Sequence, residues 1–161
     1  PDVFIGPIIN SSQRDTVQRL VDESIKAGAH VALEGKTDGN LMSPWVLTEV
    51  TNDMATACNE VFGPVISILR ARDEVEAIAI ANDTEYGLSG SVFTKDLYHG
   101  ILVGKRMDTG MVHVNDQSIN DETHVMFGGV KASGIGRFND EWVLEKFTTD
   151  RWISVQVKPR F

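Results

Sequence analysis

A predicted helical turn meets a predicted strand at Glu60-Val61-Phe62-Gly63-Pro64. The turn covers residues 53–60, with Asp53 placed as its cap, and the strand covers residues 61–69, with Gly63-Pro64 kinking its start. A carboxylate held at such a junction can accept hydrogen bonds from two adjacent hydroxyl groups, as a ribose presents them. Judged by position alone, Glu60 is more often a solvent-exposed acid at a helix end.

A second glycine-rich stretch closes a long predicted loop, Phe127-Gly128-Gly129-Val130-Lys131-Ala132-Ser133-Gly134-Ile135-Gly136-Arg137. Its glycines let the backbone pass close to a bulky group. The spacing fits neither the dinucleotide-binding nor the Walker phosphate loop, so composition alone indicates a long structural turn. Lys131 in this stretch is expected to be structural, because nothing in the sequence indicates that it is desolvated.

The rest of the chain alternates between helical and strand patterns, which predicts an α/β fold with a mainly parallel sheet flanked by helices. Asn10 or Ser11 is expected to cap the first helix, and Gly28 to end it. The predicted helices cover residues 11–27, 73–82, 97–107 and 141–147. The other predicted strands cover residues 30–33, 44–50, 88–94, 110–114 and 151–157, with a turn over residues 34–40.

Composition excludes several classes of function. The 161 residues carry a net charge of −8, which argues against nucleic acid and anionic membranes as partners. No apolar run approaches the roughly 20 residues that a membrane span requires. A single cysteine, Cys58, excludes an internal disulfide and fits the cytoplasm. The four histidines show no metal-like spacing, so we predict no metal site.

In this order and spacing, the two glycine-containing stretches resemble the C-terminal portion of the NAD(P)-dependent aldehyde dehydrogenase family. The resemblance extends over essentially the whole chain. It implies that Glu60 holds the nicotinamide ribose of NAD or NADP and that Phe62 lines the cofactor site. The family pattern Gly-x-Lys-x-Ser-Gly-x-Gly matches residues 129–136. Phe127, just before it, then corresponds to a residue that walls the aldehyde pocket.

Residues 116–126 stand where this family varies its substrate entrance. Together with the following Phe-Gly-Gly, they resemble the benzaldehyde and vanillin dehydrogenase branch, which implies an aromatic aldehyde as substrate. His124 is a candidate for the border of that entrance, although a polar loop residue without a role is more common. Asn115 ends a predicted strand where the resembled family commonly has a Val-Asn pair. It is interpreted as a loop anchor that acts through its amide, with a direct role as the alternative.

The resemblance assigns no catalytic residue to this chain. It implies that the nucleophilic cysteine, the general-base glutamate, the oxyanion asparagine and the Rossmann-like domain belong to upstream segments that this sequence does not contain. Cys58 stands two residues before Glu60, where the family does not place its thiol, and it is expected to be a structural or incidental thiol. The intact protein would oxidise an aldehyde to a carboxylic acid, and this chain alone would be inactive.

The C-terminal residues 151–157 alternate between polar and apolar side chains. Such a strand is an aggregation hazard unless it is paired. In the resembled family the last strand pairs within the oligomer interface, which implies a homodimer or homotetramer, with 1–149 as part of the catalytic domain and 150–161 as an oligomerisation strand. The alternative is a strand that closes its own sheet.

Two other functions remain open: a non-catalytic oligomerisation or regulatory fragment, and a dehydrogenase that transfers the acyl group to coenzyme A or phosphate.

Overall fold

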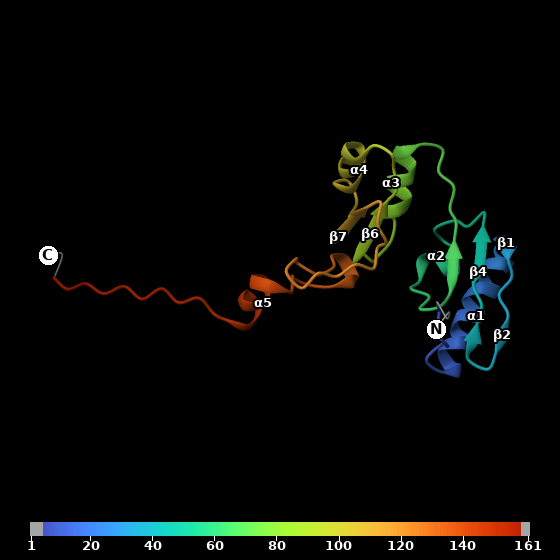
Figure 1. The fold of residues 1–161 in the computed structure, drawn as a ribbon, viewed down its shortest axis with the longest axis horizontal. Coiled ribbons are helices and arrows are strands. Elements are labelled where there is room, and N and C mark those ends of the chain that lie inside the picture. The colour runs from blue at the N-terminus through green and yellow to red at the C-terminus, as the bar shows by residue number, and fades with distance from the viewer. Residues whose placement is uncertain (1–4, 159–161) are drawn as a thin grey trace. The chain divides into compact units, whose positions relative to one another are not determined.

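The computed structural model describes residues 5–158 (Figure 1). The chain forms two compact units, Pro1–Glu85 and Tyr86–Phe161, which we call the N-terminal and C-terminal units. In the described range, no helix combines the length and apolar character needed to cross a membrane.

The N-terminal unit opens with helix α1 (Ser11–Lys26), close to the predicted range. The Asn10 side chain caps it by accepting a hydrogen bond from the Gln13 amide at 2.8 Å, as expected. The helix ends at Ala27, followed by Gly28 in the left-handed region at φ 114°. Its apolar stripe enters the core through three buried side chains, Val17, Leu20 and Val21.

A three-stranded sheet packs in the same unit, in the order β1-β4-β5. Strands β1 (His30–Leu33) and β4 (Trp45–Thr48) are antiparallel, whereas β4 and β5 (Val65–Ser67) are parallel. Residues 34–40 were predicted as a turn, but they include β2 (Thr37–Asp38), which forms a hairpin with β3 (Leu41–Met42). Leu47 on β4 is fully buried at the centre of the core.

Two short helices complete this unit, α2 (Ala55–Cys58) and α3 (Glu74–Asn82). The prediction that Asp53 caps α2 is wrong. Met54 occupies that position without a side-chain cap, and the Asp53 carboxylate instead accepts the hydroxyl hydrogen of Thr51. The strand predicted over residues 61–69 shortens to β5 (Val65–Ser67), because residues 61–64 form the turn described below.

The C-terminal unit contains a parallel pair, β6 (Ser89–Val92) and β7 (Met111–Val114), connected through helix α4 (Leu97–Gly104). The helix approaches β7 through its two glycines. A Cβ added at Gly100 would lie 2.7 Å from Val114 Cγ1, and one at Gly104 would lie 2.9 Å from Val112 Cγ1. Glycines that weaken a helix by propensity therefore permit close packing here.

The last regular elements are the 3₁₀ turn η1 (Lys131–Ser133) and helix α5 (Asp140–Phe147). In the described range, strand pairing forms three small sheets that mix parallel and antiparallel ladders. The fold is therefore α/β, but the single mainly parallel sheet is not confirmed.

The strand predicted over residues 151–157 is also not formed. These residues follow α5 without strand pairing in the part of the chain that the structure describes (Figure 1). Trp152 and Val157 are each 91% exposed. A strand needs a partner for its backbone hydrogen bonds, and the apolar alternation alone does not provide one.

Candidate functional site

The Glu60–Pro64 turn lies against the first half of α1. Gln13 Nε2 donates a hydrogen bond to the Val61 carbonyl oxygen at 2.9 Å and makes a longer one, 3.4 Å, to the Phe62 carbonyl oxygen. Gly63 touches the buried Val17, because a Cβ at Gly63 would lie 2.6 Å from Val17 Cγ2. The turn is thus held by the hydrogen bonds of Gln13 and by an apolar contact with Val17, both from the same helix.

Phe62 has an uncommon combination of backbone and side-chain properties. Its φ of 47° lies in the left-handed region, which costs a bulky residue roughly 1–3 kcal/mol. The side chain is 76% exposed, so packing within the described residues does not compensate for that cost. Strain of this kind is concentrated at ligand and active sites, which supports a binding role for this aromatic ring.

A pocket of about 620 Å³ opens beside this turn, and we call it the α1 pocket. Its volume lies within the usual range for small-molecule sites. The walls are predominantly apolar, and the Gln13 side chain adds a polar amide. The α1 pocket is lined by residues 5–9, Gln13, Phe62, Gly63 and Pro64. Glu60 is exposed two residues before Phe62.

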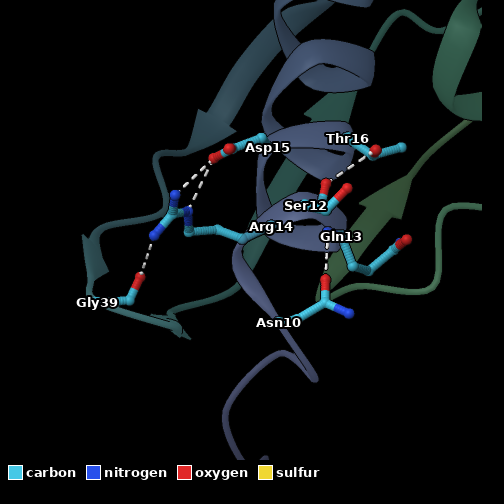
Figure 2. A network of polar contacts seen from close by, with 7 residues as sticks. All are labelled: Asn10, Ser12, Gln13, Arg14, Asp15, Thr16 and Gly39. Carbon is cyan, nitrogen blue, oxygen red and sulfur yellow. Dashed lines mark hydrogen bonds and ion pairs between the residues drawn. The ribbon is translucent and has the colours of Figure 1, made fainter.

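The wall formed by residues 5–9 is fixed by the hairpin β2–β3. The Ile8 amide donates to the Asn40 carbonyl oxygen at 2.8 Å. Arg14 reaches from α1 to the same hairpin and donates to the Gly39 carbonyl oxygen at 2.9 Å, while Asp15 holds its guanidinium at 2.7 Å (Figure 2). The hairpin therefore anchors both the entry segment and the first turn of α1.

Cys58, the last residue of α2, is exposed. Its sulfur accepts a hydrogen bond from Asn59 Nδ2 at 3.3 Å and lies 3.9 Å from the Asp53 carbonyl oxygen. Neither group is a general base that would activate a nucleophilic thiol. The expectation that Cys58 is a structural or incidental thiol stays a prediction.

The glycine-rich loop of the C-terminal unit is bound to the start of β6 and β7. The Gly87 amide donates to Ser133 Oγ, and the Val130 amide donates to the Gly87 carbonyl oxygen, both at 2.9 Å. Arg137 Nη1 donates to the carbonyl oxygens of Gly129 and Gly136 at 2.9 and 2.8 Å. These contacts are structural, because they use the loop's own polar groups to fix its path.

Phe127 leads into that loop and is half-buried. Its backbone forms an antiparallel bridge with Phe138, with amide–carbonyl distances of 3.1 and 2.8 Å. His124 is exposed, and its Nδ1 lies 3.9 Å from the Glu122 carboxylate. The structure therefore places both predicted substrate-pocket residues on one segment of the C-terminal unit, whereas Glu60 and Phe62 belong to the N-terminal unit.

Asn115 anchors the end of β7, as predicted. Its Oδ1 accepts the Thr94 amide and its Nδ2 donates to the Thr94 carbonyl oxygen, both at 2.7 Å. Its φ of 59° is left-handed, a conformation that asparagine tolerates better than most residues.

A second pocket, of about 360 Å³, lies between β7 and the loop that follows it. Among its lining residues are His113, Asp121 and Glu122. His113 Nε2 is buried without a hydrogen-bond partner in the described structure. Over that same range, no group of three or more His, Cys, Asp or Glu residues is arranged to hold a metal ion.

Two positioning side chains were missed by the sequence reasoning, Gln13 and Asn139. Asn139 Nδ2 donates to the Asp121 carboxylate at 2.9 Å and to the Val125 carbonyl oxygen at 3.2 Å, which fixes the loop bearing His124. Gln13 makes its contacts across 48 residues of sequence. Local patterns carry no signal for contacts of this range. The cap at Asn10 indicates only where the helix that bears Gln13 begins.

The chain belongs to the aldehyde dehydrogenase family, whose family model matches residues 1–153. Benzaldehyde dehydrogenase YfmT of Bacillus subtilis is 49% identical over 160 residues, 99% of this chain and 33% of that protein. Vanillin dehydrogenase of Corynebacterium glutamicum is 47% identical over 153 residues, 95% of this chain and 32% of that protein. The chain thus spans about a third of the length of these curated relatives.

Solved structures agree with this assignment. A salicylaldehyde dehydrogenase from Pseudomonas putida G7, complexed with salicylaldehyde, superposes with a TM-score of 0.93 at 34% identity, covering 99% of this chain and 33% of that one. An aldehyde dehydrogenase from Mycobacterium tuberculosis, complexed with NAD⁺, superposes with a TM-score of 0.85 at 38% identity, covering 90% of this chain and 31% of that one.

Proposed function

We propose that this chain is the C-terminal, cofactor- and substrate-holding part of an NAD(P)-dependent aldehyde dehydrogenase that oxidises an aromatic aldehyde to a carboxylic acid. The observation that carries the proposal is the Glu60–Pro64 turn, held against α1 beside an apolar pocket with Phe62 in a strained, exposed conformation. Membership of the family and the relatives named for benzaldehyde and vanillin support the substrate class.

The cofactor end of the site fits this role. Glu60 presents an exposed carboxylate that can accept hydrogen bonds from the two hydroxyls of a ribose. Phe62 offers an aromatic face on the rim of the α1 pocket. NAD or NADP supplies the hydride acceptor when bound, and these residues bind and orient it. The NAD⁺ complex of the Mycobacterium tuberculosis relative supports this class of cofactor.

The substrate end is assigned to the C-terminal unit. Phe127 supplies a half-buried aromatic wall, and the loop bearing His124 borders the entrance. An aromatic wall favours a flat aromatic aldehyde through stacking. The salicylaldehyde complex of the Pseudomonas putida structure supports such a substrate.

The bond-making residues are proposed to lie in the remaining two-thirds of a longer protein. We expect the nucleophilic cysteine, general base and oxyanion asparagine there, so that this chain alone is inactive. Residues 1–149 would complete the catalytic domain, and residues 150–161 would form an oligomerisation strand in a homodimer or homotetramer; residues 1–4 and 159–161 of these ranges lie outside the described residues. The exposed apolar side chains of residues 152–157 support that pairing, and the single cysteine supports a cytoplasmic location.

The test is NAD(P)⁺-dependent oxidation of benzaldehyde, followed at the absorbance of the reduced nicotinamide, by the full-length protein beside this chain alone. We expect activity in the full-length protein only, and a Glu60→Gln variant with a raised KM for the cofactor. Glu34→Gln, which changes an exposed acid elsewhere in the same unit, is the matched control.

Three results would contradict the proposal in different ways. A full-length protein inactive towards aromatic aldehydes would remove the substrate assignment. Turnover that requires coenzyme A or phosphate would identify the acyl-transferring class. Activity of this chain alone that a Cys58→Ser change abolishes would make Cys58 the nucleophile.

A further inference from the structure

We infer that Gln13 is a positioning residue for cofactor binding: its side-chain amide holds the Val61 and Phe62 carbonyls and thereby sets where Glu60 and Phe62 meet the cofactor. The inference rests on the proposed function, because it explains how the turn of that site is kept in place. Gln13 is not itself assigned a contact with the reacting atoms.

The geometry at Gln13 is specific. Its Nε2 lies 2.9 Å from the Val61 carbonyl oxygen in a partly buried contact and 3.4 Å from the Phe62 carbonyl oxygen. The backbone of Gln13 is in turn fixed, because its amide donates to Asn10 Oδ1 in the cap of α1. A rigid helix end therefore supports the donor, and the two carbonyls flank the strained peptide of Phe62.

The far side of the turn is held independently. The Val65 amide donates to the Gly63 carbonyl oxygen and the Trp45 amide donates to the Pro64 carbonyl oxygen, both at 2.8 Å. These bonds fix the exit into β5 but leave the residues before Gly63 to other contacts. In the described residues, the side-chain donor found on the Val61 and Phe62 carbonyls is Gln13.

The left-handed φ of 47° at Phe62 makes this support necessary. A bulky residue relaxes towards the β or right-handed region unless its surroundings prevent it. Loss of the amide would allow the turn to relax, which would displace the Phe62 ring and the carboxylate two residues before it. The expected consequence is weaker cofactor binding, with the aldehyde site of the C-terminal unit unaffected.

The test compares Gln13→Met with Gln18→Met in the full-length enzyme. Gln13→Met keeps the length of the side chain and removes the donor. Gln18 lies on the same helix, and its amide donates to the Asp22 carboxylate at 2.9 Å and not, among the described residues, to the Glu60–Pro64 turn, so its change is the matched control. Gln13→Lys restores a donor of sufficient reach.

We expect Gln13→Met to raise the KM for NAD(P)⁺ by roughly 3- to 10-fold, the factor that one lost hydrogen bond gives. The KM for benzaldehyde should stay within about twofold in all variants, because Gln13 makes these contacts within the N-terminal unit, whereas Phe127 and His124 belong to the C-terminal unit. Gln13→Lys should recover most of the loss, and Gln18→Met should show none. A purely structural role would instead lower the melting temperature and leave the cofactor KM unchanged.

A combined background separates positioning from direct contact, because Gln13 also lines the α1 pocket. In a Glu60→Gln, Phe62→Ala protein, Gln13→Met should change the cofactor KM by less than about twofold, because the residues that it positions are gone. If Gln13→Met raises the cofactor KM by the same factor in both backgrounds, the inference is wrong and Gln13 contacts the cofactor directly.

The remaining outcomes also decide. If Gln13→Met has the same cofactor KM as Gln18→Met, the inference is wrong. The proposed function still stands in that case if Glu60→Gln raises the cofactor KM. An unchanged KM in Glu60→Gln would instead remove the cofactor assignment itself. If Gln13→Met does not fold, Gln13→Lys and Gln13→Glu replace it, and equal cofactor KM values in those two would refute the need for a donor.

Discussion

Gly110 and Gly128 approach so closely that a Cβ added at Gly110 would lie 1.8 Å from the Gly128 carbonyl oxygen. No side chain other than hydrogen fits in that space, and the clash would be with backbone that cannot rotate away. The contact fastens the glycine-rich loop to the start of β7, beside the Gly110 amide that donates to the Gly87 carbonyl oxygen at 2.9 Å.

Gly110→Ala should therefore destabilise the protein by about 2 to 3 kcal/mol, in the upper part of the usual range for overpacking, because the clash is with backbone. Gly134→Ala is the control, since a Cβ there would find its nearest neighbour at 3.5 Å, an ordinary contact. Urea unfolding of both variants measures the difference. Equal stabilities would show that the loop can move away from β7.

The sequence predicted the elements whose causes are local. Helix α1 follows from the cap at Asn10 and an apolar stripe, and both are visible within one segment. Asn115 was interpreted as an anchor because it ends a strand in a recognisable pair. Glu60 and Phe62 were predicted as cofactor residues from a short motif, and that assignment remains a proposal.

What the sequence did not predict depends on contacts between distant segments. Gln13 holds Val61 across 48 residues, and no periodicity reports such a bond. Gly100 has a low intrinsic helix propensity, yet it allows α4 to approach Val114, which propensity does not indicate. Residues 151–157 have a strand-like alternation, yet strand formation depends on a partner that alternation cannot supply.

The cap of α1 should contribute measurably to stability. Asn10→Ala removes the oxygen that accepts the Gln13 amide and should cost about 1 kcal/mol, typical of a lost N-cap. Asn10→Ser keeps a capping oxygen and should retain most of that stability. Thermal unfolding of the two variants tests the assignment, which fails if alanine and serine are equally stable.

The Arg72–Glu76 pair at the start of α3 makes stability depend on pH. Hydrogen bonding from the Arg72 side chain, at 2.9 Å, and from its backbone amide, at 2.5 Å, lowers the pKa of Glu76 below its ordinary value. A carboxyl whose pKa is lowered by folding stabilises the protein above its unfolded pKa. That stabilisation is lost as the pH falls through the folded pKa.

Arg72→Ala should therefore raise the pKa of Glu76 towards its ordinary value, as followed by carbon NMR of the carboxyl group. Its stability deficit should be present at neutral pH and vanish in acid, where Glu76 is protonated in both proteins. High salt should reduce the deficit, because the Arg72 side chain is exposed and the Glu76 side chain is in part accessible to solvent. A deficit that persists unchanged below the pKa of Glu76 would contradict this origin.

The strain at Phe62 predicts a conflict between stability and binding. Phe62→Gly and Phe62→Ala both remove a ring that is 76% exposed, so each loses little buried area. Glycine adopts the φ of 47° without a steric penalty, whereas alanine retains the penalty. Phe62→Gly should thus be more stable than Phe62→Ala by about 1 kcal/mol, even after the greater chain entropy of glycine is subtracted.

In the full-length enzyme, both variants should bind NAD(P)⁺ more weakly than the parent protein, as measured by cofactor KM. A glycine variant less stable than the alanine variant would show that the left-handed turn is not maintained in solution. Undiminished cofactor binding in both would show that the strained ring serves another purpose.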